Sequence, residues 1–235
     1  MLSWRGVDVA KRLVLWDVDH TLIATRGVGH EAFAAAFERV TGRPLEKQAE
    51  ITGRSELAIL RETLVLHGLP RDLVDFQEYT EILASEYLRR AGELRERGHA
   101  LPGAAAALGT LASLPGVVQT AATGNVRSVA EIKLQTFGLD RHIDFEVGGY
   151  GEDAEVRADM VRVALRRAGV EPNEAIIFGD TVADVEAGLA TGVFAVAVAT
   201  GRTSAAELTA AGADRVLLGL EETAVVAGLV CDLPS

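Results

Sequence analysis

Two pairs of aspartates stand directly behind short apolar runs of the sequence. Asp17 and Asp19 follow one such run, and Asp180 and Asp184 follow another. Carboxylates that are brought together repel one another, so each pKa rises unless a cation is present. Carboxylate oxygens are the ligands that Mg²⁺ prefers, and bound Mg²⁺ usually keeps waters and takes a substrate phosphate as well. If the fold gathers these four side chains, they predict a magnesium site that acts on phosphate.

Thr123, which is followed by Gly124 and Asn125, stands behind a third apolar run. Taken alone, a threonine here is typical of a loop, and an aspartate behind a strand is often the cap of the next helix. The shared context favours a joint site, because ligands bind beyond the carboxyl ends of the strands in an open parallel sheet. We therefore expect Thr123 to lie beside the aspartates.

Apolar runs of strand length recur along the chain and alternate with segments of helical pattern. They lie at residues 13–16, 117–122, 143–147, 175–178, 193–198 and 215–218. Strands that are buried on both faces are apolar throughout, and their alternation with helices is typical of a parallel sheet. We predict an α/β fold whose core is a doubly wound, Rossmann-like parallel sheet.

The stretch from residue 23 to residue 100 has a different pattern. It offers no comparable apolar run, and its apolar residues recur at helical spacing, as at Phe33, Phe37 and Val40. We therefore predict two domains. Residues 1–22 and 101–235 form the α/β core, and residues 23–100 form an inserted all-helical domain.

Three segments resemble motifs of the haloacid dehalogenase superfamily. They are Asp17-Val18-Asp19-His20-Thr21 for the first motif, Thr123 for the second, and Gly179-Asp180-Thr181-Val182-Ala183-Asp184 for the fourth. The helical insertion resembles the cap domain of the phosphoglycolate phosphatase-like branch. The resemblance covers essentially the whole chain, and it implies hydrolysis of a phosphate ester beneath a helical cap.

The resemblance also implies a role for each matched residue. Asp17 would be the nucleophile that forms an aspartyl-phosphate. Asp19 would be the general acid and then the general base, and Thr123 would donate a hydrogen bond to the transferring phosphoryl group. Mg²⁺ would be held by the Asp17 carboxylate, the Asp19 backbone carbonyl and Asp180, with Asp184 supporting the site from behind or through a water.

The chain departs from the family pattern at its third motif, which is normally a lysine. Residues 151–159 contain no lysine, and Arg157 is the best positional match. A second cation is needed beside so many carboxylates, and an arginine can supply the charge although its planar fork differs from an ammonium. We predict that Arg157 takes the place of the lysine; the alternative is a solvated helix residue. Lys133 lies about two helical turns beyond Thr123, on a segment that should run away from the strand ends.

Candidate substrate contacts are less specific. Gly124 and Asn125 follow Thr123 directly, and Arg54 stands in a cap loop that could reach over the site. His20 replaces the glycine that the family usually has at that position. For Arg54 and His20, the alternatives are a solvated residue and a spectator that leans toward the cap.

The predicted function is Mg²⁺-dependent hydrolysis of a small phosphorylated metabolite. The first alternative is a phosphosugar mutase of the β-phosphoglucomutase type, against which Glu56 counts, because that branch has an arginine there. A catalytically inactive binding module is a third possibility that the intact carboxylates disfavour. A phosphonatase would need a cap lysine, where the cap has only Lys47, and a dehalogenase would not keep Asp19.

The composition narrows the choice of partners and compartment. The 235 residues carry a net charge of −11, which repels nucleic-acid phosphates and anionic lipid. No run approaches the roughly 20 apolar residues of a membrane span, and residues 1–12 lack the apolar stretch of a signal peptide. With Cys231 as its single cysteine, we expect a cytoplasmic protein that binds neither nucleic acid nor membrane. The oligomeric state is left open.

Overall fold

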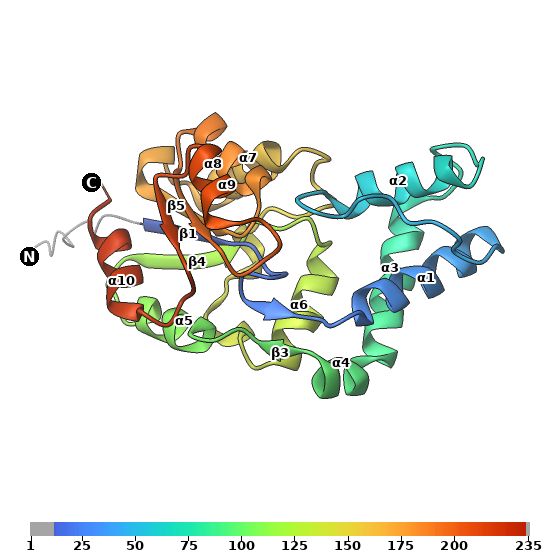
Figure 1. Ribbon diagram of the computed structural model, residues 1–235, viewed down its shortest axis with the longest axis horizontal. Coiled ribbons are helices and arrows are strands. Elements are labelled where there is room, and N and C mark those ends of the chain that lie inside the picture. The colour runs from blue at the N-terminus through green and yellow to red at the C-terminus, as the bar shows by residue number, and fades with distance from the viewer. Residues whose placement is uncertain (1–11, 234–235) are drawn as a thin grey trace, which may run out of the picture.

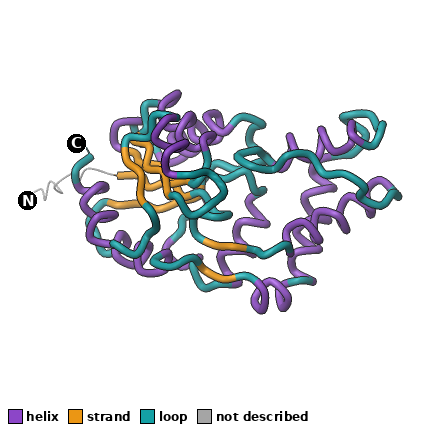
Figure 2. Tube along the Cα trace, viewed as in Figure 1, coloured by secondary structure: helices purple, strands orange, loops and turns teal. Residues whose placement is uncertain are grey.

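The computed structural model describes residues 12–233 of the chain. Its centre is a sheet in the order β4-β1-β5-β6-β7, in which every neighbouring pair is parallel (Figure 1, Figure 2). The strands are β1 (Arg12–Trp16), β4 (Val117–Ala121), β5 (Ala175–Gly179), β6 (Phe194–Val198) and β7 (Arg215–Leu217). The predicted α/β class is confirmed. Residues 1–11 and 234–235, assigned above to the core domain, lie outside the described residues.

Helices cover both faces of the sheet, because its strands present apolar side chains to either side. Val14 and Trp16 of β1 share a buried cluster with α5, α6 and α10, whereas Leu13 and Leu15 share another with α7 and α8. The helices of this part are α5 (Ala104–Ala112), α6 (Arg127–Thr136), α7 (Arg157–Ala168), α8 (Val182–Thr191), α9 (Ala205–Ala210) and α10 (Thr223–Cys231). The doubly wound arrangement is therefore confirmed as well.

The apolar run at residues 143–147 does not form the strand that we predicted. Two short 3₁₀ helices occupy this region, at Asp140–His142 and Phe145–Val147. The Asp144 side chain accepts a hydrogen bond from the backbone N–H of Glu146 (3.0 Å), which turns the chain out of the extended path. The segment contacts β4 through a hydrogen bond from the backbone N–H of Asp144 to the Gln119 carbonyl (2.8 Å), and an isolated parallel bridge between Ala122 and Gly149 lies just beyond it.

Residues 23–100 leave the sheet after β1 and return before α5, and most of them are helical (Figure 1). The helices are α1 (Val28–Thr41), α2 (Glu56–Leu66), α3 (Phe76–Arg89) and α4 (Ala91–Arg97). The expectation that this insertion is all-helical is wrong at its two ends, where β2 (Ile23–Ala24) pairs antiparallel with β3 (His99–Ala100). The outgoing and returning segments lie side by side there, and pairing satisfies backbone groups that would otherwise lack partners.

The helical insertion shares an apolar core with helix α6. Val129 of α6 is buried in one cluster with Phe33 of α1 and Leu83 of α3. Leu134, also on α6, belongs instead to the cluster beneath the sheet. Helix α6 therefore links the two parts of the molecule, and Figure 1 shows it between the sheet and the helices of the insertion.

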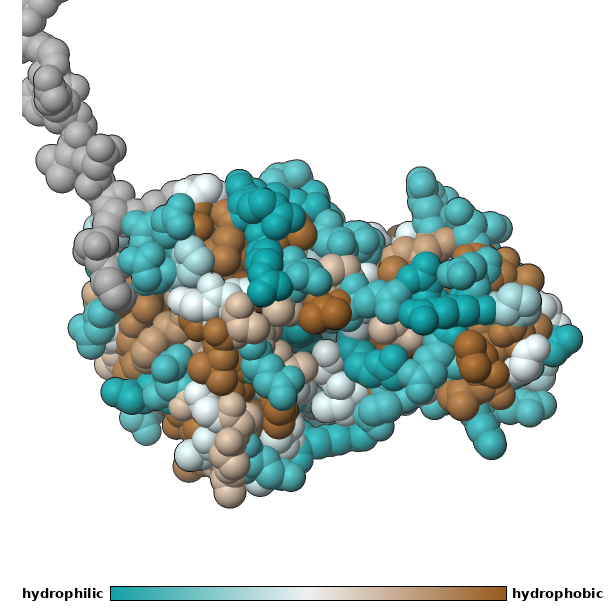
Figure 3. Space-filling view, turned by 90° about the horizontal axis from the view of Figure 1, so that it is seen from above, coloured by the Kyte–Doolittle hydropathy of each residue, from teal (hydrophilic) through white to brown (hydrophobic). Residues whose placement is uncertain are grey.

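The surface shows no dominant apolar face in the view of Figure 3, where hydrophilic and hydrophobic residues are mixed over both lobes. Large exposed apolar side chains such as Leu88 and Leu218 stand on separate elements. Single apolar residues of this kind are ordinary on protein surfaces. Across residues 12–233, no helix combines the length and apolarity that crossing a membrane requires.

Candidate active site

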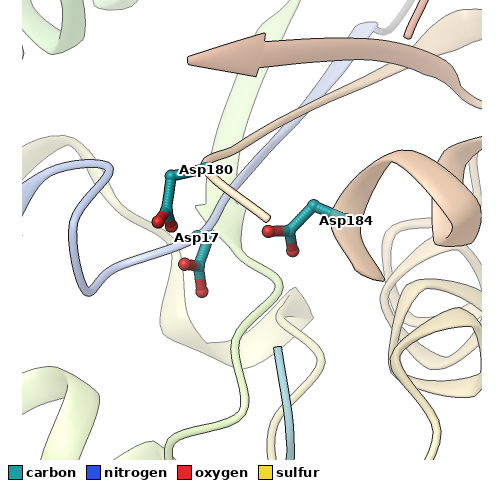
Figure 4. A group of neighbouring side chains, drawn as sticks. All are labelled: Asp17, Asp180 and Asp184. Carbon is teal, nitrogen blue, oxygen red and sulfur yellow. The ribbon is translucent and has the colours of Figure 1, made fainter. Parts of the chain in front are cut away.

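Three of the predicted aspartates meet at the carboxyl ends of the central strands. Asp17 follows β1, Asp180 follows β5, and Asp184 lies in the first turn of α8 (Figure 4). One carboxylate oxygen from each residue lies within 4.8 Å of the other two, and all three side chains are buried. We call Asp17, Asp180 and Asp184 the acidic triad.

Local structure holds the acidic triad in place. Asp184 completes the N-terminal cap of α8, since its Oδ2 accepts hydrogen bonds from the backbone N–H (3.1 Å) and the hydroxyl (2.6 Å) of Thr181. Two glycines make room for the carboxylates. A Cβ at Gly179 would collide with the Asp184 carboxylate, and a Cβ at Gly201 would collide with the Asp180 carboxylate. Glycine at these two positions therefore leaves room for the buried carboxylates.

The acidic triad is electrostatically unbalanced. Burial raises the pKa of Asp17 to about 7, with further increases from the charges of Asp184 and Asp19, while Arg157 opposes the rise. Burial and the charge of Asp17 raise the pKa of Asp180 to about 9. Three buried carboxylates with one cationic partner need another positive charge to stay ionised. Their oxygen-only donor set fits a hard divalent cation.

Among the described residues, Arg157 is the cationic side chain that pairs with the acidic triad. It is the first residue of α7, and its side chain is 6% exposed. The guanidinium lies 3.4 Å from Asp17 Oδ1 (Nη1) and 3.1 Å from Asp184 Oδ1 (Nε), and Nη1 donates to the carbonyl of Ala122 (3.1 Å). This placement is what a substitute for the missing lysine needs. Its catalytic role stays a prediction.

Asp19 lies on the other side of Asp17, in quite different surroundings. Its Oδ2 accepts hydrogen bonds from Lys133 Nζ (2.6 Å) and Asn125 Nδ2 (2.8 Å). Burial alone would raise the pKa of Asp19, but the charge and hydrogen bond of Lys133, with the bond from Asn125, lower it. At neutral pH this carboxyl group is therefore ionised in the protein.

The expectation that Lys133, on a segment running away from the strand ends, stays clear of the site is wrong. Side chains on a helix lean toward its N-terminus, and α6 begins at Arg127, beside the strand end that carries Thr123. The long side chain of Lys133 therefore reaches back over about 9 Å of helix to the site. Val129, Lys133 and Leu134 all lie on buried positions of α6 at helical spacing. A lysine within an apolar stripe of a helix was the sequence signal that could have predicted a buried, paired Lys133.

The loop after β4 contacts both Asp19 and the helical insertion. Asn125 Nδ2 also donates to Thr123 Oγ1 (2.9 Å), so both predicted residues lie at the site. The carbonyl of Gly124 accepts a hydrogen bond from the backbone N–H of Glu56 (2.8 Å) in the insertion, and a Cβ at Gly124 would collide with the carbonyl oxygen of Arg54. Glycine is therefore required here for close approach of the cap loop.

A cavity of about 560 Å³ opens between the sheet and the insertion, above the aspartates. Asp17, Asp19, Asp180, Arg157 and Lys133 line its floor. The insertion contributes an apolar wall and a carboxylate, from Phe33, Ile51, Ile59, Leu83 and Glu56. Glu56 accepts a hydrogen bond from the Tyr79 hydroxyl (2.7 Å), and burial raises its pKa. The cavity has room for a small molecule and presents both charge and apolar surface to it.

The whole arrangement lies within a stretch that matches a known family model. The model of the haloacid dehalogenase-like hydrolases matches residues 11–192, which include the acidic triad, Asp19, Thr123 and Arg157. This chain belongs to that family. It is accordingly an enzyme of the hydrolase class. None of the curated proteins matches the chain.

Solved structures show the same fold. A hydrolase from Pseudomonas syringae superimposes with a TM-score of 0.66 at 23% identity, covering 92% of this chain and 97% of that protein. A predicted phosphatase from Clostridium acetobutylicum gives 0.64 at 18% identity, covering 94% and 99%. A Bacteroides vulgatus protein, provisionally named a beta-phosphoglucomutase, gives 0.64 at 18% identity, covering 96% and 92%. At these identities the likeness supports the fold and does not select a reaction.

Two predicted substrate contacts of this haloacid dehalogenase-like hydrolase are placed less directly. The φ angle of His20 is 62°, a left-handed conformation that explains why the family usually has glycine there; histidine adopts it more readily than most residues. Its carbonyl accepts a hydrogen bond from Thr200 Oγ1 (2.6 Å). Arg54 lines the cavity, but its guanidinium pairs with Glu62 within the insertion.

Proposed function

We propose that this hydrolase uses Mg²⁺ to release phosphate from a small phosphomonoester through an aspartyl-phosphate on Asp17. The observation that carries the proposal is the acidic triad beside Arg157 at the floor of the cavity. The side chains of Asp17, Asp180 and Asp184 and the backbone carbonyl of Asp19 would hold the cation. When bound, it would offset the charge of these carboxylates and of a phosphoryl group.

In the first step, a carboxylate oxygen of Asp17 attacks phosphorus, and the bond between phosphorus and the ester oxygen breaks. The departing oxygen takes a proton from Asp19. Asp19 rests as a carboxylate, so this proton has to come from solvent or with the minor fraction of the substrate whose phosphoryl group is still singly protonated near neutral pH. Arg157 and Thr123 balance and orient the phosphoryl oxygens, which is the main task of a phosphoryl-transfer site.

In the second step, Asp19 accepts a proton from water, and the water oxygen attacks phosphorus. The bond between phosphorus and Asp17 then breaks, inorganic phosphate leaves, and Asp17 is regenerated. The low pKa of Asp19 suits this step, because a base must be unprotonated to accept the proton.

We further propose that residues 23–100 act as a cap over the cavity, on a single core domain formed by residues 1–22 and 101–235. The β2–β3 pair marks the crossing between the parts, and Arg61 and Arg71 of the cap pair with Glu155 of the core. Because α3 also packs on α6, opening has to slide the cap along α6 or move both. Small-angle scattering with and without a phosphate analogue should show a more compact liganded protein; identical curves would contradict the motion.

The substrate is proposed to be a small phosphorylated metabolite in the cytoplasm. The volume of the cavity suits one, and the acidic composition disfavours nucleic acid. A mutase would also have to hold a second phosphate group, and Glu56 on the cap wall offers no positive charge to it.

The proposal is tested by measuring phosphate release from a panel of phosphorylated metabolites, with Mg²⁺ and with excess chelator. We expect release with Mg²⁺ for at least one ester, loss of release in chelator, and a fall of at least about 1,000-fold in Asp17→Asn. A product that keeps its phosphate at a new position would show a mutase. A variant that retains a tenth of the turnover would exclude the covalent route.

A further inference from the structure

Lys133 is a buried cation that the steps above do not use. Its side chain is 4% exposed, in a chain that has three lysines. An ammonium group is buried at high cost unless it is paired. The pairing here is with the active site itself, since Nζ lies 2.6 Å from Asp19 Oδ2 and 2.6 Å from Asn125 Oδ1.

The two oxygens of the Asp19 carboxylate are treated differently. Both hydrogen bonds, from Lys133 and from Asn125, end on Oδ2. Among residues 12–233, no donor makes a hydrogen bond to Oδ1. The residue lines the cavity and its side chain is 33% exposed. One oxygen is therefore fixed by the protein, and the other is left to the cavity.

The group that fixes Oδ2 is itself held on several sides. Asn125 bonds to Lys133 through its carbonyl oxygen and to Thr123 Oγ1 through its amide nitrogen (2.9 Å). The Lys133 ammonium also lies 5.2 Å from the centre of the Tyr87 ring on the cap helix α3. Asp19, in contrast, stands in the loop after β1, where a side chain has more freedom without such support.

We propose that Lys133 is a positioning residue: with Asn125 it anchors Oδ2 of Asp19, so that Oδ1 faces the cavity as the oxygen that exchanges protons with the leaving group and with water. The inference rests on the proposed function. Loss of the anchor lets the carboxylate rotate, and proton transfer at both steps then becomes slower. Groups misplaced by about 1 Å can lose on the order of 100-fold in rate.

The test compares two esters in Lys133→Met, which removes the ammonium and keeps an unbranched apolar chain. Nitrophenolate leaves without needing a proton, so with 4-nitrophenyl phosphate kcat/KM should change by less than about threefold. The second step still needs Asp19, so kcat should fall about 100-fold, with KM falling alongside. The variant should then accumulate phosphoryl-Asp17, visible as a nitrophenolate burst. With an alkyl ester such as glycerol 2-phosphate, kcat/KM should fall about 100-fold.

A purely structural role for Lys133 gives a different result. In that case kcat and kcat/KM fall by the same factor with both esters, and no nitrophenolate burst is seen. This result would overturn the inference. Unchanged kinetics overturn it too. The matched control is Lys47→Met, because Lys47 is exposed in a cap loop and does not line the cavity. If Lys133→Met does not fold by circular dichroism, the same criteria are applied to Lys133→Gln.

The wild type separates this inference from the proposed function. A wild-type protein that transfers no phosphoryl group to Asp17 overturns both. If the wild type does phosphorylate Asp17, and the Lys133 variant loses the same fraction of kcat/KM with the alkyl ester as with 4-nitrophenyl phosphate, only the inference about Lys133 is overturned.

Discussion

The acidic triad and the Asp19 end of the same cavity hold their carboxylates in opposite electrostatic states. At the acidic triad, Arg157 pairs with Asp17 and Asp184, no ion pair reaches Asp180 among the described residues, and the pKa values of Asp17 and Asp180 are raised. Two residues further along the chain than Asp17, Asp19 is paired with Lys133, and its pKa is lowered.

The difference indicates what each end is built to receive. The acidic triad has more negative charge than Arg157 offsets, so it is suited to bind a divalent cation. The Asp19 end is balanced by the protein's own lysine and is ready to accept a proton without any addition. Substitutions should therefore have unlike effects at the two ends, on stability as well as on rate.

The largest effect is expected at the acidic triad, from Asp180→Asn. Removal of one carboxylate should lower kcat/KM by about 1,000-fold at saturating Mg²⁺ and raise the Mg²⁺ concentration required for half-maximal activity. Steady-state kinetics across a Mg²⁺ titration measure both. Asp159→Asn, at an exposed aspartate of α7, is the control. Equal loss in both variants would contradict the assignment of Asp180.

The same substitution should stabilise the metal-free protein, because it relieves repulsion between buried like charges. We expect a gain of about 1 kcal/mol in the free energy of unfolding of Asp180→Asn in chelator. Urea unfolding measures it. A metal-free variant less stable than the metal-free wild type would show that the triad is not under electrostatic strain.

A smaller effect is expected from Arg157→Met, which leaves Asp17 and Asp184 without their cation. Loss of this donor should reduce kcat/KM by about 100-fold. Arg157→Lys should recover part of the loss, because the charge is kept while the planar fork is lost. Arg162→Met is the control on the same helix, since Arg162 pairs with exposed Asp159. If Arg157→Met turns over substrate as fast as the control, Arg157 does not contribute to catalysis.

The smallest effect is expected at a carboxylate that is balanced by arginines and does not line the cavity. Glu86 of α3 is buried, and Arg89, Arg39 and Arg90 lower its pKa to about 2 although burial alone would raise it. Glu86→Gln should cost about 1–2 kcal/mol of stability at pH 7, discounted because two of the arginines are largely exposed, and leave turnover unchanged.

The pH dependence of that stability has a defined sign. A lowered folded-state pKa stabilises the protein fully above the ordinary value of 4.5, and the contribution is lost as pH falls from there toward 2. The difference between wild type and Glu86→Gln should therefore shrink when urea unfolding is measured at pH 3 instead of pH 7. A difference that grows at low pH would contradict the ion-pair account.

The sequence was informative where the order of motifs and the strand ends coincide. Asp17, Thr123 and Asp180 each follow an apolar run, and a parallel sheet has to bring such positions to one edge. The alternation of runs with helices also predicted the doubly wound sheet. Arg157 was placed correctly beside the triad from its position relative to these motifs, although no single pattern marked it.

The predictions that failed concern features that depend on a local hydrogen bond, on very short strands, or on contacts between residues distant in sequence. Asp144 turns the run at 143–147 out of the sheet, which an apolar pattern cannot reveal. The β2 and β3 strands are two residues each, too short for any periodicity. Lys133 is far from Asp19 in sequence, and the pairing depends on how α6 passes the site.

The central claim is that Asp17 carries the phosphoryl group during turnover. It is tested most directly by quenching the enzyme in acid during turnover of 4-nitrophenyl phosphate with Mg²⁺, followed by mass spectrometry of the peptide that contains Asp17. We predict one added phosphoryl group on Asp17 in the wild type and none in Asp17→Asn. Steady release of phosphate with no phosphoryl group on Asp17, or with one on another residue, would contradict the account.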